Sequence, residues 1–278
     1  YLFDMGNYND KMLGIAAGYM EYLGTSDMTP EQVKSEFFRM GCSFNVKPGS
    51  ERTYVSISGL AENMPKAIAL FEKLMADAQV NAPAYTNLVG DILKSRVDAK
   101  ANQGTNFSQL RQYVTWGPEI KKTIPSAQEL QTANPQELVD RIHNIFSYKH
   151  HILYYGPASE KELIALLDKE HRTPETLKDI PAGVELKQAN TEETKIFVAP
   201  YDAKQIYMSQ FSHRNEKYDI NIEPTRQMYS EYFSGGMNSI VFQEMRESRG
   251  LAYTAYAGLA SPSFQKYDYT FISYIATQ

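Results

Sequence analysis

The sequence predicts a mixed fold of helices and strands, of the α+β class, in two domains. Three observations carry this prediction: a length of 278 residues, amphipathic helical segments that alternate with β-rich runs, and one polar stretch without periodicity. A chain of this length corresponds to roughly two ordinary domains, each able to bury its own core. The polar stretch, residues 172–194, contains two prolines and a glycine and is the predicted linker. The predicted domains are therefore residues 1–171 and 195–278.

The first predicted domain opens with helices on either side of a hairpin. Residues 9–23 have the apolar spacing of a buried helix face. In TPEQVKSEFFRMG, Thr29 is a capping residue and Gln32 closes a capping box, which predicts the start of a second helix. SFNVKPGSERTYVSISGL alternates around a Pro48-Gly49 turn, as in a β-hairpin. Residues 62–80 carry one apolar stripe and predict a third helix.

The alternation continues along the rest of the chain. We expect mostly helix over residues 86–115, a helix from Asn134, a short strand in HILYYG and an amphipathic helix in SEKELIALLDKEH. After the linker, KIFVAP and IYMSQFS predict strands, and a long helix from about 224 to 248 is interrupted at two glycines. The final run, YDYTFISYIATQ, has the composition of an unfinished strand, so we expect the second domain to be truncated at its C-terminus.

Composition excludes several classes of function. The 28 Lys and Arg are balanced by 33 Asp and Glu, and the net charge of −5 gives no electrostatic footprint for nucleic acid. No apolar run approaches the roughly 20 residues that span a bilayer, so we expect no membrane span. These features fit a soluble protein, periplasmic or cytoplasmic if bacterial. The lone Cys42 cannot form an internal disulfide.

The histidines do not have the spacing of a zinc peptidase. Such a site needs two histidines one helical turn apart with a glutamate beside them, because this spacing places the ligands and the base on one face. No such pair occurs, and polar neighbours favour surface or lightly packed histidines. The five are His143, His150, His151, His171 and His213. No phosphate-binding loop, dinucleotide fingerprint or nucleophile elbow is present either.

One stretch carries a specific motif. FSGGMNSIVFQEMRESRGLAYTAYAGL, residues 233–259, contains in order a glycine-rich helix start, an apolar helix, an Arg-Glu-x-Arg-Gly-Leu-Ala-Tyr run and a β-strand. On composition alone, Arg246 and Arg249 are a solvated helix end that complements the helix dipole. The ordered set, however, resembles the second-domain signature of the pitrilysin/insulinase (M16-like) family of zinc metallopeptidases, the inverzincins. This resemblance implies a functional role for Arg246 and Tyr253.

The resemblance extends to the first domain, where the family's zinc motif is degenerate. In the catalytic half of these enzymes, H-x-x-E-H precedes a Gly-Thr pair, a capped helix, a hairpin and another helix. Here AAGYMEYLGT, residues 16–25, occupies the same setting. If Glu21 holds the glutamate position, Gly18 and Tyr22 stand where the two histidine ligands would be. The resemblance therefore implies a non-catalytic half with no metal and no catalytic residue of its own.

The family fold and function follow as expectations from this resemblance. We expect tandem α/β sandwich domains of the LuxS/processing-peptidase-like type, each with a mainly antiparallel sheet and helices on one side. The implied function is to bind a peptide substrate for a partner half that carries H-x-x-E-H and zinc, on the same chain or as a separate subunit. Arg246 and Tyr253 would hold the substrate and stabilise its tetrahedral intermediate, since both donate hydrogen bonds. The chain alone is expected to be inactive.

Two alternatives stay open at the level of sequence. The family also has members retained as structural or docking subunits related to processing-peptidase core proteins, without a peptidase role. The Arg246 and Tyr253 pair argues against this alternative, because a scaffold has no need to retain it. A separately encoded substrate-binding subunit is the second alternative.

Overall fold

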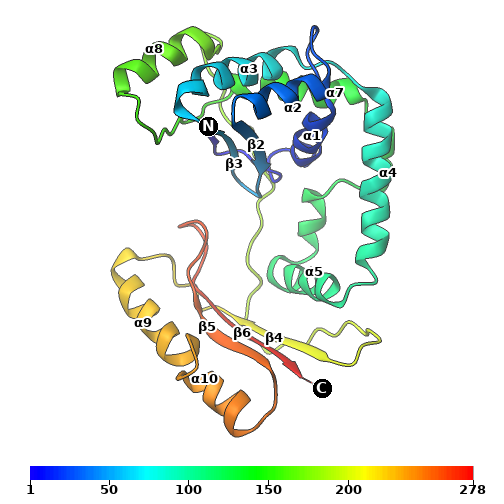
Figure 1. The fold of residues 1–278 in the computed structure, drawn as a ribbon. Coiled ribbons are helices and arrows are strands. Elements are labelled where there is room, and N and C mark those ends of the chain that lie inside the picture. Colours follow the sequence, from blue (N-terminus) through cyan, green and yellow to red (C-terminus); the bar gives the residue numbers. More distant parts are fainter. Residues whose placement is uncertain (278) are drawn as a thin grey trace. The chain divides into compact units, whose positions relative to one another are not determined.

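The computed structural model describes residues 1–277, which form two compact units. Unit 1 comprises residues 1–96 and 121–185, and unit 2 comprises residues 97–120 and those from 186 onward. Unlike the predicted domains, unit 2 therefore includes a helical segment from the middle of the chain. Each unit contains one three-stranded sheet in which all pairings are antiparallel (Figure 1). These sheets and their helices confirm the predicted α+β class.

The elements follow one another along the chain as follows. The strands are β1 Leu2–Phe3, β2 Cys42–Pro48, β3 Thr53–Gly59, β4 Ile206–Ser212, β5 Thr254–Ala260 and β6 Thr270–Thr277. The longer helices are α1 Leu13–Tyr19, α2 Pro30–Arg39, α3 Met64–Asp77, α4 Ala82–Ala99, α5 Gln103–Trp116, α7 Pro135–Asn144, α8 Glu160–Glu170 and α9 Glu223–Ser234. The shorter helical segments are η1 Met20–Tyr22, η2 Ala61–Asn63, η3 Pro118–Thr123, α6 Ala127–Thr132, η4 Ile145–Ser147, η5 Ile220–Ile222, α10 Ile240–Phe242 and η6 Gln243–Ser248.

Local sequence signals position the elements of unit 1. The Thr29 hydroxyl accepts a hydrogen bond from the backbone N–H of Gln32, and the Gln32 side-chain oxygen accepts one from the backbone N–H of Thr29. These two bonds confirm the predicted capping box at α2. The predicted hairpin pairs β2 with β3, in register from Cys42 opposite Gly59 to Pro48 opposite Thr53. Residues of β3 alternate between buried and exposed, so one face of the sheet is covered. Helices α1, α2 and α3 pack against these strands (Figure 1).

In unit 2, helices cover both a face and an edge of the sheet, whose strand order is β4-β6-β5. The α5 residue Phe107 packs its ring 5.7 Å from that of Tyr207 on β4. Helix α9 runs beside β5, where the Ser234 hydroxyl accepts from the Ala257 N–H and Arg226 donates to the Leu259 carbonyl. Side chains of α9 thus satisfy backbone groups that an edge strand would otherwise leave open.

The predicted linker, residues 172–194, contains no helix or strand but is fastened to both units. The Val184 N–H donates to the Tyr8 carbonyl in unit 1, at 2.7 Å, and the Ala189 N–H donates to the Thr115 carbonyl in unit 2, at 2.8 Å. The division between the units accordingly falls within this stretch, between residues 185 and 186.

Two predicted strands are wrong. HILYYG contributes only a single bridge, between His151 and Leu2, and residues 195–200 of KIFVAP form no strand. Apolar composition alone favours a strand, but a strand also needs a paired neighbour, which a periodicity argument cannot supply. In the described part of the chain, no helix is long and apolar enough to cross a bilayer.

We expect Phe71→Ala to destabilise unit 1 by about 3–5 kcal/mol, the usual cost of emptying a core aromatic site. Phe71 is fully buried on α3 and packs 5.1 Å from the Phe44 ring. Phe38→Ala is the matched control, since Phe38 is 86% exposed and its loss should change the free energy of unfolding by under about 0.5 kcal/mol. Urea denaturation followed by circular dichroism gives both values. Equal destabilisation by the two changes would contradict the described core.

Candidate functional site

The Arg/Tyr motif lies in unit 2 at the end of a helix that leads into β5. Ser239 caps the start of α10, where its hydroxyl accepts from the Phe242 N–H. The following segment, η6, is a π-helix, a widened helical form that occurs mostly as short segments and frequently at functional sites. Gly250 then reverses the chain with a φ of +58°, and its N–H donates to the Arg246 carbonyl at 3.1 Å.

The structure brings Arg246 and Tyr253 into contact. The guanidinium carbon of Arg246 lies 4.5 Å from the centroid of the Tyr253 ring. It also lies 4.9 Å from the centroid of the Phe242 ring, so two aromatic rings contact the same cation. Tyr253 is 79% exposed and the Arg246 side chain is 39% exposed, which leaves both accessible to a ligand. Arg246 Nε has one acidic neighbour, a Glu247 oxygen at 3.5 Å.

Arg249 lies apart from this contact. Its Nε is 3.3 Å from a carboxylate oxygen of Glu244, and its side chain is 65% exposed. Such an exposed ion pair contributes little to stability. Phe242, by contrast, was not among the predicted site residues. A signal for it exists in the sequence, because Phe242 precedes Arg246 by four residues and residues at this spacing meet on one helix face.

The positions that were predicted to correspond to the zinc motif lie together at the end of α1. Gly18 is within α1, and a Cβ added there would meet no atom within 4 Å. Glu21 and Tyr22 follow in η1, both exposed, and the Lys34 ammonium lies 5.9 Å from the Tyr22 ring centroid. Among residues 1–277, no group of three or more His, Cys, Asp or Glu is placed to hold a metal ion.

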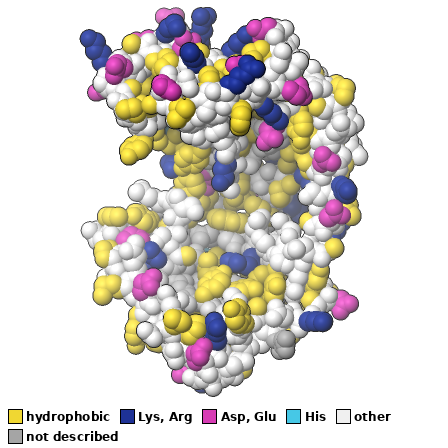
Figure 2. Space-filling view, in the orientation of Figure 1, with side chains coloured by type: hydrophobic (Ala, Val, Ile, Leu, Met, Phe, Trp, Pro, Cys, Tyr) yellow, Lys and Arg dark blue, Asp and Glu magenta, His cyan; other side chains and the backbone are white. Residues whose placement is uncertain are grey.

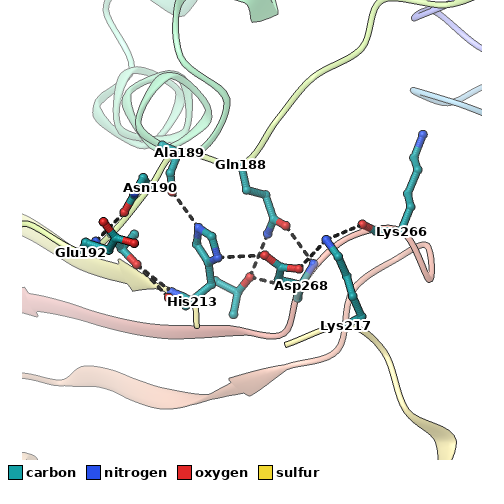
Figure 3. A network of polar contacts seen from close by, with 10 residues as sticks. Gln188, Ala189, Asn190, Glu192, His213, Lys217, Lys266 and Asp268 are labelled. Atoms are coloured by element: carbon teal, nitrogen blue, oxygen red, sulfur yellow. Dashed lines mark hydrogen bonds and ion pairs between the residues drawn. The ribbon is translucent and has the colours of Figure 1, made fainter. Parts of the chain in front are cut away.

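The prediction of surface histidines is wrong for at least two of them. The side chains of His171 and His213 are only 9% and 4% exposed. His213 lies in a polar network that ties the segment after residue 186 to the sheet of unit 2 (Figure 3). One ring nitrogen is 2.9 Å from an Asp268 oxygen and the other is 2.7 Å from the Ala189 carbonyl oxygen. These partners are far apart in sequence, so local polarity could not reveal them.

The His213 network has a histidine and an aspartate in contact but is built as an anchor. Lys217 contacts the second oxygen of Asp268 at 2.6 Å, and the Gln188 side chain accepts from the Asp268 N–H at 2.9 Å (Figure 3). Thr191 exchanges hydrogen bonds with the backbone of His213, not with its ring. The Nε2 of His213 lies within hydrogen-bonding distance of the Ala189 carbonyl oxygen, whereas its Nδ1 contacts Asp268 without forming a hydrogen bond.

Charge on the surface follows the composition. On the face that Figure 2 shows, basic and acidic side chains are interspersed and form no continuous basic stripe. This mixed distribution agrees with the modest net charge of −5.

Sequence comparisons link the chain to zinc proteases. No known family profile matches it. A protein of Rickettsia bellii named "uncharacterized zinc protease" is 25% identical over 261 residues, which cover 91% of this chain and 60% of that protein. A protein of the same name from Rickettsia felis is 20% identical over 265 residues, covering 84% of this chain and 57% of its own length. The chain thus spans less than two thirds of either relative.

Solved structures share the fold. The peptidase M16 inactive domain from Pseudomonas fluorescens superposes with a TM-score of 0.72 at 14% identity, covering 100% of this chain and 68% of that one. The periplasmic protease PqqL from Escherichia coli gives 0.77 at 12% identity, over 100% of this chain and 31% of that one. The ferredoxin protease FusC, in complex with Arabidopsis ferredoxin, gives 0.68 at 11% identity, over 99% and 30%.

Together these comparisons confirm the predicted resemblance to the pitrilysin-type, or M16, zinc peptidases. The chain has the fold of M16 peptidase domains, one of which is described as an inactive domain, and its sequence relatives are zinc proteases. Residues 16–25, which were predicted to hold the position of the zinc motif, contain no histidine.

We expect the purified chain to retain no stoichiometric zinc after dialysis, because Gly18 and Tyr22 supply no imidazole at the two ligand positions. Elemental analysis of the dialysed protein gives the ratio of zinc to chain. A zinc ion that persists at one per chain, and is lost on Glu21→Ala or Tyr22→Ala, would overturn the interpretation of residues 16–25 as a degenerate site.

Proposed function

We propose that this chain is the substrate-binding, non-catalytic half of a zinc-dependent endopeptidase that cleaves unfolded peptides. The single observation that carries the proposal is the contact between Arg246 and Tyr253, two hydrogen-bond donors on an accessible surface of unit 2. A guanidinium with five N–H donors and a phenolic O–H are suited to a carbonyl oxygen that gains negative charge. The fold and the zinc-protease relatives support a peptidase setting for this pair.

The stacking of Arg246 leaves its donors available. A ring that contacts a guanidinium by cation–π attraction covers a face of that planar group, whereas the N–H bonds point outward in its plane. Because Phe242 and Tyr253 both contact Arg246, they limit the rotamers of its long side chain before any ligand binds. The Arg246 side chain therefore loses less conformational entropy on binding. The pair is therefore preorganised to accept a peptide carbonyl.

The partner of this chain is, in this proposal, a half that carries H-x-x-E-H, on the same chain or as a separate subunit. Support comes from the zinc-protease relatives, which are longer than the part that matches. When bound in that half, zinc supplies Lewis-acid chemistry at the scissile carbonyl. The residues of this chain bind and orient the peptide and donate hydrogen bonds to its oxygen. The FusC structure contains a bound protein, ferredoxin, which supports a polypeptide ligand here.

Tyr253→Phe should lower kcat of the reconstituted two-half enzyme by about 10²–10³-fold, because a donor that strengthens its bond in the transition state affects kcat and not only KM. The change deletes one hydroxyl and leaves the ring stacked on Arg246. Arg246→Ala should have a comparable effect, and the double variant should cost less than the product, since both groups act on one oxygen. Peptide-cleavage kinetics give kcat and KM for each variant.

Arg249→Ala is the control for these variants, because Arg249 pairs with Glu244 outside the contact. Its kcat should stay within about twofold of the wild type, a difference under roughly 0.5 kcal/mol. If Tyr253→Phe and Arg246→Ala also stay within this range, the pair is structural. The chain is then better explained as a structural or docking module.

Phe242→Leu tests whether the second ring positions Arg246. Removing one exposed cation–π contact, worth about 0.5–1 kcal/mol, should reduce kcat/KM roughly twofold to fivefold. Phe242→Tyr retains an aromatic ring in contact with Arg246 and should therefore keep wild-type kinetics. Thermal unfolding of each variant is measured in parallel. Equal kinetic loss for both variants would contradict a positioning role for the ring.

A further inference from the structure

A second group of titratable side chains is enclosed in unit 1, apart from the Arg/Tyr motif. It comprises His150, His171, which follows the last turn of α8, and Glu72 of α3. The His171 Nδ1 lies 2.7 Å from Glu72 Oε1, and the His150 Nδ1 lies 2.7 Å from the Tyr148 carbonyl oxygen. The two Nε2 atoms face each other at 2.9 Å. We call this group the histidine clasp.

Counting donors and acceptors fixes the number of protons in the clasp. A carbonyl oxygen and a carboxylate only accept hydrogen bonds, so both Nδ1 atoms must carry hydrogen. A neutral imidazole has a single N–H, which would leave a bare lone pair on each Nε2. Two lone pairs facing each other at 2.9 Å form no bond and repel. A third hydrogen between the rings removes the conflict.

We propose that His150 and His171 share one extra proton, which fastens the C-terminal end of α8 to the segment at His150, and that this fastening loosens when the proton leaves at higher pH. The device concerns the stability of unit 1 and is independent of the proposed peptidase role.

The surroundings indicate which ring carries the charge. Burial lowers the pKa of His150 most; its bond to the Tyr148 carbonyl acts in the opposite direction, and the adjacent His171 adds a smaller lowering. The Glu72 carboxylate lies against the His171 Nδ1, so the charge of the shared proton is compensated on the His171 side of the pair. The Tyr1 hydroxyl donates a hydrogen bond to the same Glu72 oxygen. Burial and this hydrogen bond raise the pKa of the Tyr1 hydroxyl, which therefore stays protonated.

Several polar groups near the clasp have partners of their own. The Tyr1 backbone N–H donates to the Val55 carbonyl. Among the neighbours in sequence, Lys149 pairs with Asp179 and Glu170 pairs with Lys169. The remaining contacts are aromatic, with Phe3 and Phe146 packed against the imidazole rings. Glu72 is thus the carboxylate that compensates the extra proton.

A metal ion fits the clasp less well than a proton. Two Zn–N bonds of about 2.0–2.1 Å at a tetrahedral angle hold their nitrogens roughly 3.3 Å apart. The separation of 2.9 Å is that of an N–H···N hydrogen bond. Zinc also needs further protein ligands, and the described residues provide no group of three that could bind it.

Helix α8 contacts α3, and its side chains Leu163, Leu166 and Leu167 are partly buried. None of the residues Glu160–Glu170 is fully buried, so contacts at the C-terminal end of the helix, the clasp among them, contribute to holding it. Loss of the proton removes one charge-assisted hydrogen bond in a sheltered site, which corresponds to roughly a tenfold rise in local opening. The clasp is complete below the pH at which the pair loses its extra proton and incomplete above it.

Hydrogen exchange of the α8 amides in the 278-residue chain tests the proposal. Protection factors, corrected for intrinsic exchange, are compared at about pH 5.5 and about pH 8.5, on either side of the ordinary histidine pKa. We expect wild-type protection to fall roughly tenfold at the higher pH. In His150→Gln the amide can donate to or accept from His171, so protection should persist at both pH values. His143→Gln, which changes a histidine outside the clasp, should retain the wild-type response.

Three outcomes would overturn the proposal. The first is a wild-type α8 whose protection is the same at both pH values. The second is nitrogen NMR that finds both His150 and His171 neutral at the lower pH. The third is zinc bound at one per chain that is lost on His150→Gln.

Discussion

A glycine in the left-handed region of backbone space, Gly250, allows Arg246 and Tyr253 to meet. Its φ of +58° costs an L-residue about 1–2 kcal/mol, and glycine avoids this cost. The turn lets the Leu251 N–H reach back to the Met245 carbonyl at 2.9 Å, which closes the widened π-helical end. Past this turn the chain enters β5, and Tyr253 arrives over the guanidinium. The contact on which the proposed function rests is therefore a consequence of how one helix ends.

The two halves of the family signature have different physical requirements here. A zinc site needs imidazoles at its ligand positions, and residues 16–25 contain no histidine; if Glu21 holds the glutamate position, Gly18 and Tyr22 stand where the two ligands would be. The space around Gly18 is open, so no packing constraint explains the glycine. The Arg/Tyr contact, in contrast, needs a capped helix, a left-handed glycine and a strand, and all three are present. A chain that keeps the donors without the metal is consistent with a binding role beside a separate zinc-bearing half.

The sequence predicted those structural features that depend on residues close to one another along the chain. The capping box at Thr29, the hairpin around Pro48 and Gly49, and the motif from Arg246 to Tyr253 all involve residues within a few positions of one another. Contacts between distant segments were beyond the reach of these signals. His171 meets Glu72 across 99 positions, and HILYYG forms no strand because β1 offers only two residues for pairing. Polar neighbours in sequence say little about burial when the partners come from other elements.

The proposed function requires this chain to bind unfolded peptide without cleaving it. Native mass spectrometry of the chain, mixed with an unfolded peptide of about twenty residues and equimolar zinc, tests this claim directly, because one spectrum reports both the complex and the intact peptide mass. The proposed function predicts a one-to-one complex that contains uncleaved peptide, with the complex reduced when Arg246 is replaced by alanine. Peptide fragments produced by the chain alone, or no complex at any peptide concentration, would contradict it.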